Sequence, residues 1–220
     1  MSNPVLIIAN KNYSSWSLRA WLALTHAGVV FDEVRIALGM PDTREKLLGY
    51  SPAGRVPVLI DGRTKVWESI AICEYAAERW PDKRFWPADR AARGHARSVA
   101  AEMHAGFVAL RTAMPMNCRG RYPGKGRSGA VDADIARIEA LWADCLKRSG
   151  GPFLFGAFSI ADAMFAPVVS RFLTYDVRLA GALAQYAQAV LDLPAMKEWY
   201  AAGAAEPEFL AADEPYATTV

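Results

Sequence analysis

Residues 55–69 read Arg-Val-Pro-Val-Leu-Ile-Asp-Gly-Arg-Thr-Lys-Val-Trp-Glu-Ser, and this stretch decides the fold. A short apolar run at 58–60 and a second short strand predicted at 64–67 flank Asp61-Gly62, a dipeptide typical of tight hairpin turns. Pro57 stands just before the first run, where its missing N–H is tolerated and where an X–Pro bond can be cis. The pattern therefore predicts a β-hairpin whose first strand follows a proline.

A helix is predicted directly after the hairpin, over 70–79. Glu68 and Ser69 stand at its start, and Ser69 is the expected N-cap. The hairpin returns this helix N-terminus to the side of Pro57. Peptide groups next to Val56, together with the positive helix end near Ser69, would suit a small, extended, anionic peptide.

The composition is that of an ordinary globular protein. The 220 residues are 53% apolar and 22% charged, and the net charge of +2 is too small to argue for nucleic acid or an anionic membrane. Cys73, Cys118 and Cys145 form no Cys-x-x-Cys pair, which favours a reducing, cytoplasmic setting. The first residues are not expected to form a signal peptide, and no apolar run of the sequence is long enough to predict a bilayer-spanning helix.

Residues 4–79 follow the order β-α-β-α-β-β-α. The other expected elements here are a central strand at 5–9, a helix that Ser15 or Ser17 caps and that stops at Gly28, an edge strand at 31–36 and a short helix at 42–48. The first two strands would be parallel through a crossover, and the hairpin would complete a four-stranded mixed sheet.

The remainder is predicted to be all-helical. Pro81 and Pro87 mark a linker, and helices are expected over 91–114, 132–148, 159–173, 182–191 and 195–202, with a Gly/Arg-rich loop at 117–129. Ser159 and Asp162 have the spacing of a capping box at a helix start. The fold class is therefore α/β plus all-α.

These features in combination resemble the cytosolic glutathione S-transferases, over about residues 5–205. Val56-Pro57 with Glu68-Ser69 looks like the glutathione-binding motif of that family, and Ser159 with Asp162 matches its buried capping box. The resemblance implies a thioredoxin-like glutathione-binding domain at 1–80, a linker at 81–90 and a helical domain at 91–220 that forms the electrophile pocket. Glutathione would be the co-substrate, and no metal is expected.

The segment that contains Ser14 and Ser15 is similar to the serine-type classes, closest to the zeta- and theta-like bacterial members. A serine five positions before Arg19, as in the zeta class, points to Ser14 as the catalytic residue; the theta-like spacing of four points to Ser15. Such a serine would donate a hydrogen bond to the glutathione thiolate and would not act as a nucleophile. From the residues alone, plain helix capping is the alternative role of both serines.

The resemblance also assigns the glutathione contacts. The backbone of Val56, beside cis Pro57, would pair with the cysteinyl part of glutathione. Ser69 would hold the γ-glutamyl carboxylate and Glu68 the ammonium group beside it. Arg55 would reach the glycyl carboxylate, or it is a solvated loop charge.

The second substrate would lie between the sheet domain and the first long helix of the second domain. The candidate pocket residues are Tyr13, Met103, Phe107, Arg111, Met114, Met116, Asn117 and Arg119. Methionine and aromatic residues at helical spacing are more often core than pocket, whereas Arg111 and Arg119 suggest a carboxylated or polar co-substrate. A homodimer is also implied, in which the 91–114 helix packs on the partner's 64–79 region, with Trp67 or Trp80 exposed.

The function expected from the resemblance is that of a cytoplasmic glutathione transferase that detoxifies small electrophiles. Trp16 stands where the zeta class has cysteine, which weakens assignment as a maleylacetoacetate isomerase. The alternatives are a glutathione-dependent cis–trans isomerase of a small dicarboxylate, of the maleylacetoacetate or maleylpyruvate type, and a non-catalytic glutathione-binding module. A redox role is disfavoured because no cysteine is expected near the first helix start.

Overall fold

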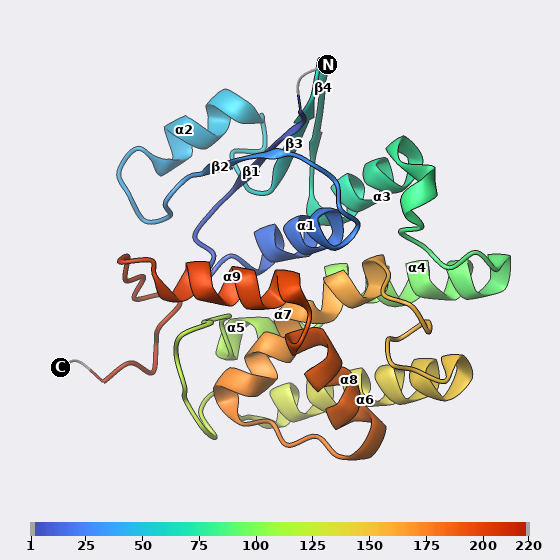
Figure 1. Cartoon of the computed structure of the whole chain (residues 1–220). Coiled ribbons are helices and arrows are strands. Elements are labelled where there is room, and N and C mark those ends of the chain that lie inside the picture. Colours follow the sequence, from blue (N-terminus) through green and yellow to red (C-terminus); the bar gives the residue numbers. More distant parts are fainter. Residues whose placement is uncertain (1–2, 219–220) are drawn as a thin grey trace.

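Four strands form a mixed sheet in the order β2-β1-β3-β4 in the computed structural model, which describes residues 3–218 (Figure 1). The strands are β1 (Val5–Ile8), β2 (Asp32–Arg35), β3 (Val58–Asp61) and β4 (Thr64–Trp67). β1 runs parallel to β2, whereas the β1–β3 and β3–β4 pairs are antiparallel. Gly62 closes the β3–β4 hairpin with a φ of 59°, a conformation that favours glycine. The predicted sheet and its hairpin are confirmed.

The two faces of the sheet are covered by different helices because side chains alternate along a strand. Ile7 and Val58 face α2 (Thr43–Tyr50), where they pack with Leu47. Leu6 and Leu59 belong to the larger core that includes α1 (Ser15–His26) and α3 (Ser69–Arg79). Figure 1 shows α1 lying between the sheet and the helical half of the molecule. The start of α1 is therefore placed where the two halves meet.

The second half is helical, as predicted. Its elements are η1 (Pro81–Lys83), α4 (Arg90–Ala105), α5 (Val108–Ala113), α6 (Gly129–Ser149), α7 (Ile160–Tyr175), α8 (Gly181–Leu191) and α9 (Pro194–Ala204). α7 is buried along nearly its whole length and contacts both α1 and α4. The capping box at its start is confirmed, since Asp162 Oδ2 accepts the Ser159 N–H at 2.8 Å and Oδ1 accepts the Leu154 N–H at 2.9 Å.

The single long helix expected over 91–114 is wrong. α4 ends at Ala105, Phe107 adopts a left-handed conformation with a φ of 57°, and α5 begins at Val108. The backbone turns tightly at Gly106, where a Cβ atom would lie 2.8 Å from the Glu102 carbonyl oxygen. The alanine-rich periodicity runs through this break, so the pattern alone did not reveal it.

Two predicted helix caps are also wrong by one residue or more. α1 is capped by Ser14, whose Oγ accepts the Ser17 N–H, and not by Ser15 or Ser17. α3 already begins at Ser69, and its N-cap is Glu68, with a φ of 72°. The side chain of Ser69 is therefore not used as a cap.

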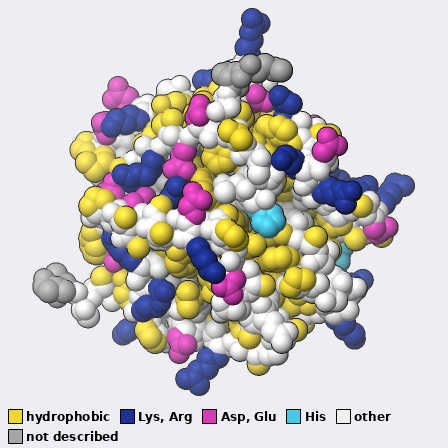
Figure 2. All heavy atoms as spheres, viewed as in Figure 1, with side chains coloured by type: hydrophobic (Ala, Val, Ile, Leu, Met, Phe, Trp, Pro, Cys, Tyr) yellow, Lys and Arg dark blue, Asp and Glu magenta, His cyan; other side chains and the backbone are white. Residues whose placement is uncertain are grey.

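The surface in the view of Figure 2 carries Lys and Arg side chains interspersed with Asp and Glu, in keeping with the small net charge. Among residues 3–218, none of the helices has both the length and the apolar character needed to cross a membrane.

Candidate active site

A cleft of about 450 Å³ lies where the start of α1 meets α5 and α7. Its walls are formed by Tyr13, Ser14, Ser15, Trp16, Leu38, Leu47, Gly54, Arg55, Val56, Val108, Arg111, Thr112, Pro115, Met116, Arg171 and Asp213. A neighbouring cavity of about 380 Å³ shares Trp16, Arg55, Val56 and Arg111 with it, and continues along Ala53, Pro57, Trp67, Glu68 and His104. The two cavities together form one extended site between the two halves.

Most of the sequence-predicted residues meet in this site. Ser14, Ser15, Tyr13, Arg55, Val56, Arg111 and Met116 line the first cavity, and Pro57 and Glu68 line the second. Met103, Phe107 and Met114 were expected in the pocket, but they are buried in the hydrophobic core and line neither cavity. Met103 lies on α4, which packs against α7, so its side chain is enclosed between helices.

The Ser14 hydroxyl belongs to a short hydrogen-bond chain at the start of α1. The Ala9 N–H donates to Ser17 Oγ at 3.1 Å, and the Oγ atoms of Ser14 and Ser17 lie 2.7 Å apart. The Ser17 N–H also donates to Ser14 Oγ. When the Ser17 hydroxyl donates to Ser14, both acceptor positions of Ser14 are used and its own hydrogen is left for the cleft.

The Ser15 hydroxyl has a different partner, the buried guanidinium of Arg171. Arg171 donates to the Met114 carbonyl at 2.8 Å, to the Pro167 carbonyl at 3.1 Å and to Ser15 Oγ at 3.4 Å. Burial lowers the pKa of Arg171 to about 10. Sequence reasoning missed this residue, although a single charged side chain in the otherwise uncharged stretch 163–175 was a usable signal.

Tyr13 lines the cleft, but its hydroxyl points to the C-terminal segment, residues 205–217. It accepts a hydrogen bond from Arg119 Nη2 at 2.7 Å and lies in hydrogen-bond contact with the Glu208 carbonyl and the Glu214 carboxylate. Burial and the contact with Glu214 raise the pKa of Tyr13. The Tyr13 hydroxyl is therefore already engaged by Arg119 and the C-terminal segment.

Arg119 was expected to attract a carboxylated substrate, and this expectation is wrong. Its guanidinium binds the carbonyl groups of Glu206 and Glu208 and the carboxylate of Glu214, and it lines neither cavity. These contacts hold the C-terminal segment in place.

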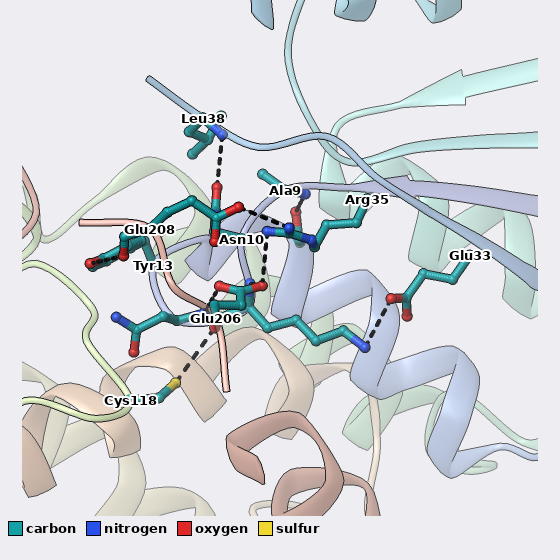
Figure 3. Close-up of polar contacts among 12 residues, drawn as sticks. Ala9, Asn10, Tyr13, Glu33, Arg35, Leu38, Cys118, Glu206 and Glu208 are labelled. Atoms are coloured by element: carbon teal, nitrogen blue, oxygen red, sulfur yellow. Dashed lines mark hydrogen bonds and ion pairs between the residues drawn. The ribbon is translucent and has the colours of Figure 1, made fainter. Parts of the chain in front are cut away.

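The C-terminal segment also fixes the turn that precedes Ser14. The Glu206 carboxylate accepts the backbone N–H of Lys11 at 2.7 Å and of Asn12 at 3.1 Å, and the Arg35 guanidinium lies beside it (Figure 3). The same segment brings Asp213 to the cleft. Nothing in the sequence pattern predicted these contacts, because residues 205–217 have no helix or strand periodicity.

One cysteine lies closer to the first helix start than expected. Cys118 Sγ is 3.6 Å from the Lys11 carbonyl oxygen, in the turn before α1. Burial raises the pKa of Cys118 to about 12, so its thiol is not ionised at neutral pH.

The other end of the site surrounds the Val56-Pro57 bond, which is cis. Ser69, at the start of α3, is fully buried and lines neither cavity, and its Oγ has no hydrogen-bond partner among the described residues. Glu68 is exposed at the N-terminus of α3, with His104 Nε2 3.9 Å from its carboxylate. Burial, and then the charge of Arg19, lower the pKa of His104. The buried Ser69 hydroxyl lies at the N-terminus of α3 and has no partner among the described residues, a combination that suits binding of an anionic group.

Comparison with known proteins identifies the class that this fold and site define. The family model of the glutathione S-transferase N-terminal domain matches residues 13–79, and the model of the C-terminal domain matches residues 126–202. Together the two models cover more than half of the chain, which therefore belongs to the glutathione S-transferase family.

Individual relatives agree with this family. A probable maleylacetoacetate isomerase from Caenorhabditis elegans is 28% identical over 176 residues, covering 77% of this chain and 79% of the relative. Maleylacetoacetate isomerase from Rattus norvegicus is 28% identical over 185 residues, covering 80% and 82%. A crystal structure of a glutathione transferase homologue from a Burkholderia strain, with bound glutathione, superposes with a TM-score of 0.73 at 21% identity and covers 93% of this chain and 100% of that one. At this identity the superposition shows the shared fold.

Proposed function

We propose that this protein is a glutathione transferase that stabilises the glutathione thiolate for attack on small electrophiles. The observation that carries the proposal is the Ser14 hydroxyl, which lines the cleft at the start of α1, accepts the Ser17 N–H and lies 2.7 Å from the Ser17 hydroxyl. With the Ser17 hydroxyl as donor to Ser14, the Ser14 hydrogen is available to an anion that enters the cleft.

The chemistry needed is a shift of the thiol pKa. A free thiol with a pKa of about 8.5 is only about 3% ionised at pH 7. Lowering the pKa by about two units takes about 2.7 kcal/mol of preferential stabilisation of the anion. One charge-assisted hydrogen bond from Ser14 supplies part of this, and the positive N-terminus of α1 adds to it.

Glutathione itself would lie along the wall formed by Val56, Pro57 and Glu68, with the start of α3 at its end. The backbone of Val56 would pair with the cysteinyl residue of the peptide, as an extended peptide pairs with a strand edge. The unused Ser69 hydroxyl would bind the γ-glutamyl carboxylate, and Glu68 its ammonium group. Arg55, exposed beside the cleft, would meet the glycyl carboxylate.

In this proposal residues 1–80 bind glutathione, residues 91–220 supply the electrophile pocket, and residues 81–90 connect the two. Cleft residues on α5 and in the loop that follows it would contact the electrophile, chiefly Val108, Arg111 and Met116. Reaction with varied electrophiles would suit a detoxifying enzyme of the cytoplasm. The three buried cysteines, none in a disulfide, are compatible with that compartment.

A homodimer is the proposed assembly. Trp67 at the end of β4 is 42% exposed beside Glu68, and a large exposed aromatic side chain of this kind is typical of an interface. The partner's 91–114 region would cover it. Sedimentation of the wild type and of Trp67→Arg tests this: a dimer that the substitution dissociates supports the proposal, and a monomeric wild type contradicts it.

A glutathione-dependent cis–trans isomerase is the second candidate, because two of the relatives that match most of this chain are named as a probable maleylacetoacetate isomerase and a maleylacetoacetate isomerase. Both candidates use the same thiolate. Measuring turnover of maleylacetoacetate and of 1-chloro-2,4-dinitrobenzene by one preparation separates them.

The transferase proposal is tested by calorimetric titration with glutathione and by turnover of the Ser14→Ala variant. We expect glutathione to bind both proteins, and turnover to fall only in the variant. Binding without any turnover in the wild type would instead favour a non-catalytic glutathione-binding module.

A further inference from the structure

Three arginine side chains surround the inner end of the cleft. Arg171 and Arg111 line it, and Arg19 is fully buried behind Trp16. The guanidinium carbon of Arg19 lies 4.3 Å from the centroid of the Trp16 ring, and that of Arg111 lies 5.3 Å from it. Trp16 thus connects the buried cation to one that faces the cavity.

These charges have no carboxylate partner. Within residues 3–218, no carboxylate oxygen lies within 4 Å of the three guanidinium groups. None of the guanidinium nitrogens of Arg19 has a hydrogen-bond partner in this part of the chain, and Arg111 Nε is buried without one. Arg171 donates only to neutral oxygens.

Uncompensated positive charge away from water is costly, and a bound anion relieves that cost. Burial is the main cause that lowers the pKa of Arg19 to about 9, and repulsion from the charges of Arg171 and Arg111 adds to it. Asp213 also lines the cleft and would oppose an anionic ligand, but it forms no ion pair with Arg171. The balance of charge at this end of the cavity is therefore positive.

We propose that Arg111 and Arg171 form a subsite for a carboxylate carried by the electrophile, so that the preferred substrates are small carboxylated electrophiles. This inference rests on the proposed transferase function and deepens it. Arg111, which is half-buried at the cleft wall, would make the direct contact, since two of its guanidinium nitrogens have no acceptor in the described structure. Arg171 and Arg19 would act mainly through their charge.

Glutathione also carries carboxylates, so the experiment must distinguish binding of the electrophile's carboxylate from binding of the carboxylates of glutathione. The probe is a pair of unreactive ligands of equal shape, 4-nitrobenzoate and 4-nitrobenzamide. Each ligand is titrated calorimetrically into the wild type and into the variants Arg111→Gln, Arg111→Lys and Asp213→Asn. Every titration is repeated in the presence of saturating S-methylglutathione. Arg63→Gln is the matched control, because Arg63 is an exposed arginine outside both cavities.

We expect the wild type to prefer the benzoate by about 10- to 100-fold, the effect of one or two charge-assisted hydrogen bonds. Arg111→Gln should abolish the preference, Arg111→Lys should restore part of it, Asp213→Asn should increase it, and Arg63→Gln should leave it unchanged. The preference should persist with S-methylglutathione bound.

Equal affinity for both ligands in the wild type, or an unchanged preference in Arg111→Gln, would overturn the subsite. Loss of benzoate binding when S-methylglutathione is added would assign the arginines to glutathione's own carboxylates and would also overturn it. If S-methylglutathione does not bind in its own titration, the transferase proposal is contradicted instead. The benzoate preference measured without S-methylglutathione then tests the subsite.

Discussion

Ser14 and Ser17 share a hydrogen bond of 2.7 Å between their Oγ atoms in the first turn of α1. Because the Ser17 hydroxyl also accepts the Ala9 N–H, it has its own hydrogen to give to Ser14. This arrangement ties the end of β1 to the serine that faces the cleft. It also means that capping of α1 and donation to a thiolate are compatible roles of one side chain.

Replacing Ser14 with alanine should lower kcat by about 10²- to 10³-fold, the usual effect of losing one preorganised donor to a developing or bound anion. Glutathione affinity should change little, because Val56, Glu68 and Ser69 are untouched. Steady-state kinetics with glutathione and a chlorodinitrobenzene electrophile provide the measurement. Ser15→Ala is the matched control, and a larger loss in that variant would transfer the role to Ser15.

Tyr13→Phe should leave kcat within about threefold of the wild type, since its hydroxyl is bound to the C-terminal segment. It should instead lower the free energy of unfolding by about 1 kcal/mol through the lost hydrogen bonds. Kinetics and thermal unfolding of the same sample check both parts. A loss of turnover as large as that of Ser14→Ala would identify Tyr13 as the thiol donor.

The anchor of the C-terminal segment should weaken in acid. Burial opposes ionisation of Glu214, but hydrogen bonds from Tyr13, Arg119 and Tyr122 outweigh it and lower its pKa below the ordinary value of 4.5. A lowered carboxyl pKa contributes stability that is present above pH 4.5 and is lost as the pH falls through the folded-state value. Glu214→Gln should therefore destabilise the protein by about 1–2 kcal/mol at pH 7 and by much less near pH 3.

Chemical denaturation of wild type and Glu214→Gln at both pH values gives this comparison. If the difference in unfolding free energy between the two proteins stays constant with pH, or grows in acid, then Glu214 does not stabilise the folded protein through its ionised carboxylate.

Asp162→Ala should lower the free energy of unfolding by about 2–4 kcal/mol, because the buried N–H groups of Leu154 and Ser159 lose their acceptor. Asp144→Ala, which removes a partly exposed carboxylate on α6, should change it by about 0.5 kcal/mol or less. Urea unfolding measures both. Equal effects of the two substitutions would show that the capping box does not stabilise α7.

Local chemistry explains which parts of the fold were predictable from sequence. The β3–β4 hairpin was found because Asp61-Gly62 is a typical turn dipeptide that directly follows the apolar run 58–60. The α7 start was found because the Ser159 and Asp162 side chains bond backbone groups within a few residues. In both cases the residues that decide the structure are neighbours in the chain.

The errors concern features set by distant contacts. The break at Gly106 interrupts a pattern that continues in register, and the residues expected in the pocket from that pattern are core. The C-terminal segment docks through ion pairs and backbone contacts to residues almost 200 positions earlier, which no local periodicity encodes. Arg171 reaches the cleft only because α7 packs against α1.

The pKa of the glutathione thiol when bound to the protein tests the central claim most directly. Titrating the thiolate by its ultraviolet absorbance in complexes of wild type and Ser14→Ala gives both values. We predict a bound-thiol pKa about two units below the free value in the wild type, and a clearly higher value in Ser14→Ala, between that of the wild type and the free value of about 8.5, because only the N-terminus of α1 still favours the thiolate. The same pKa in both complexes, or an unshifted pKa in the wild type, would contradict the role of Ser14.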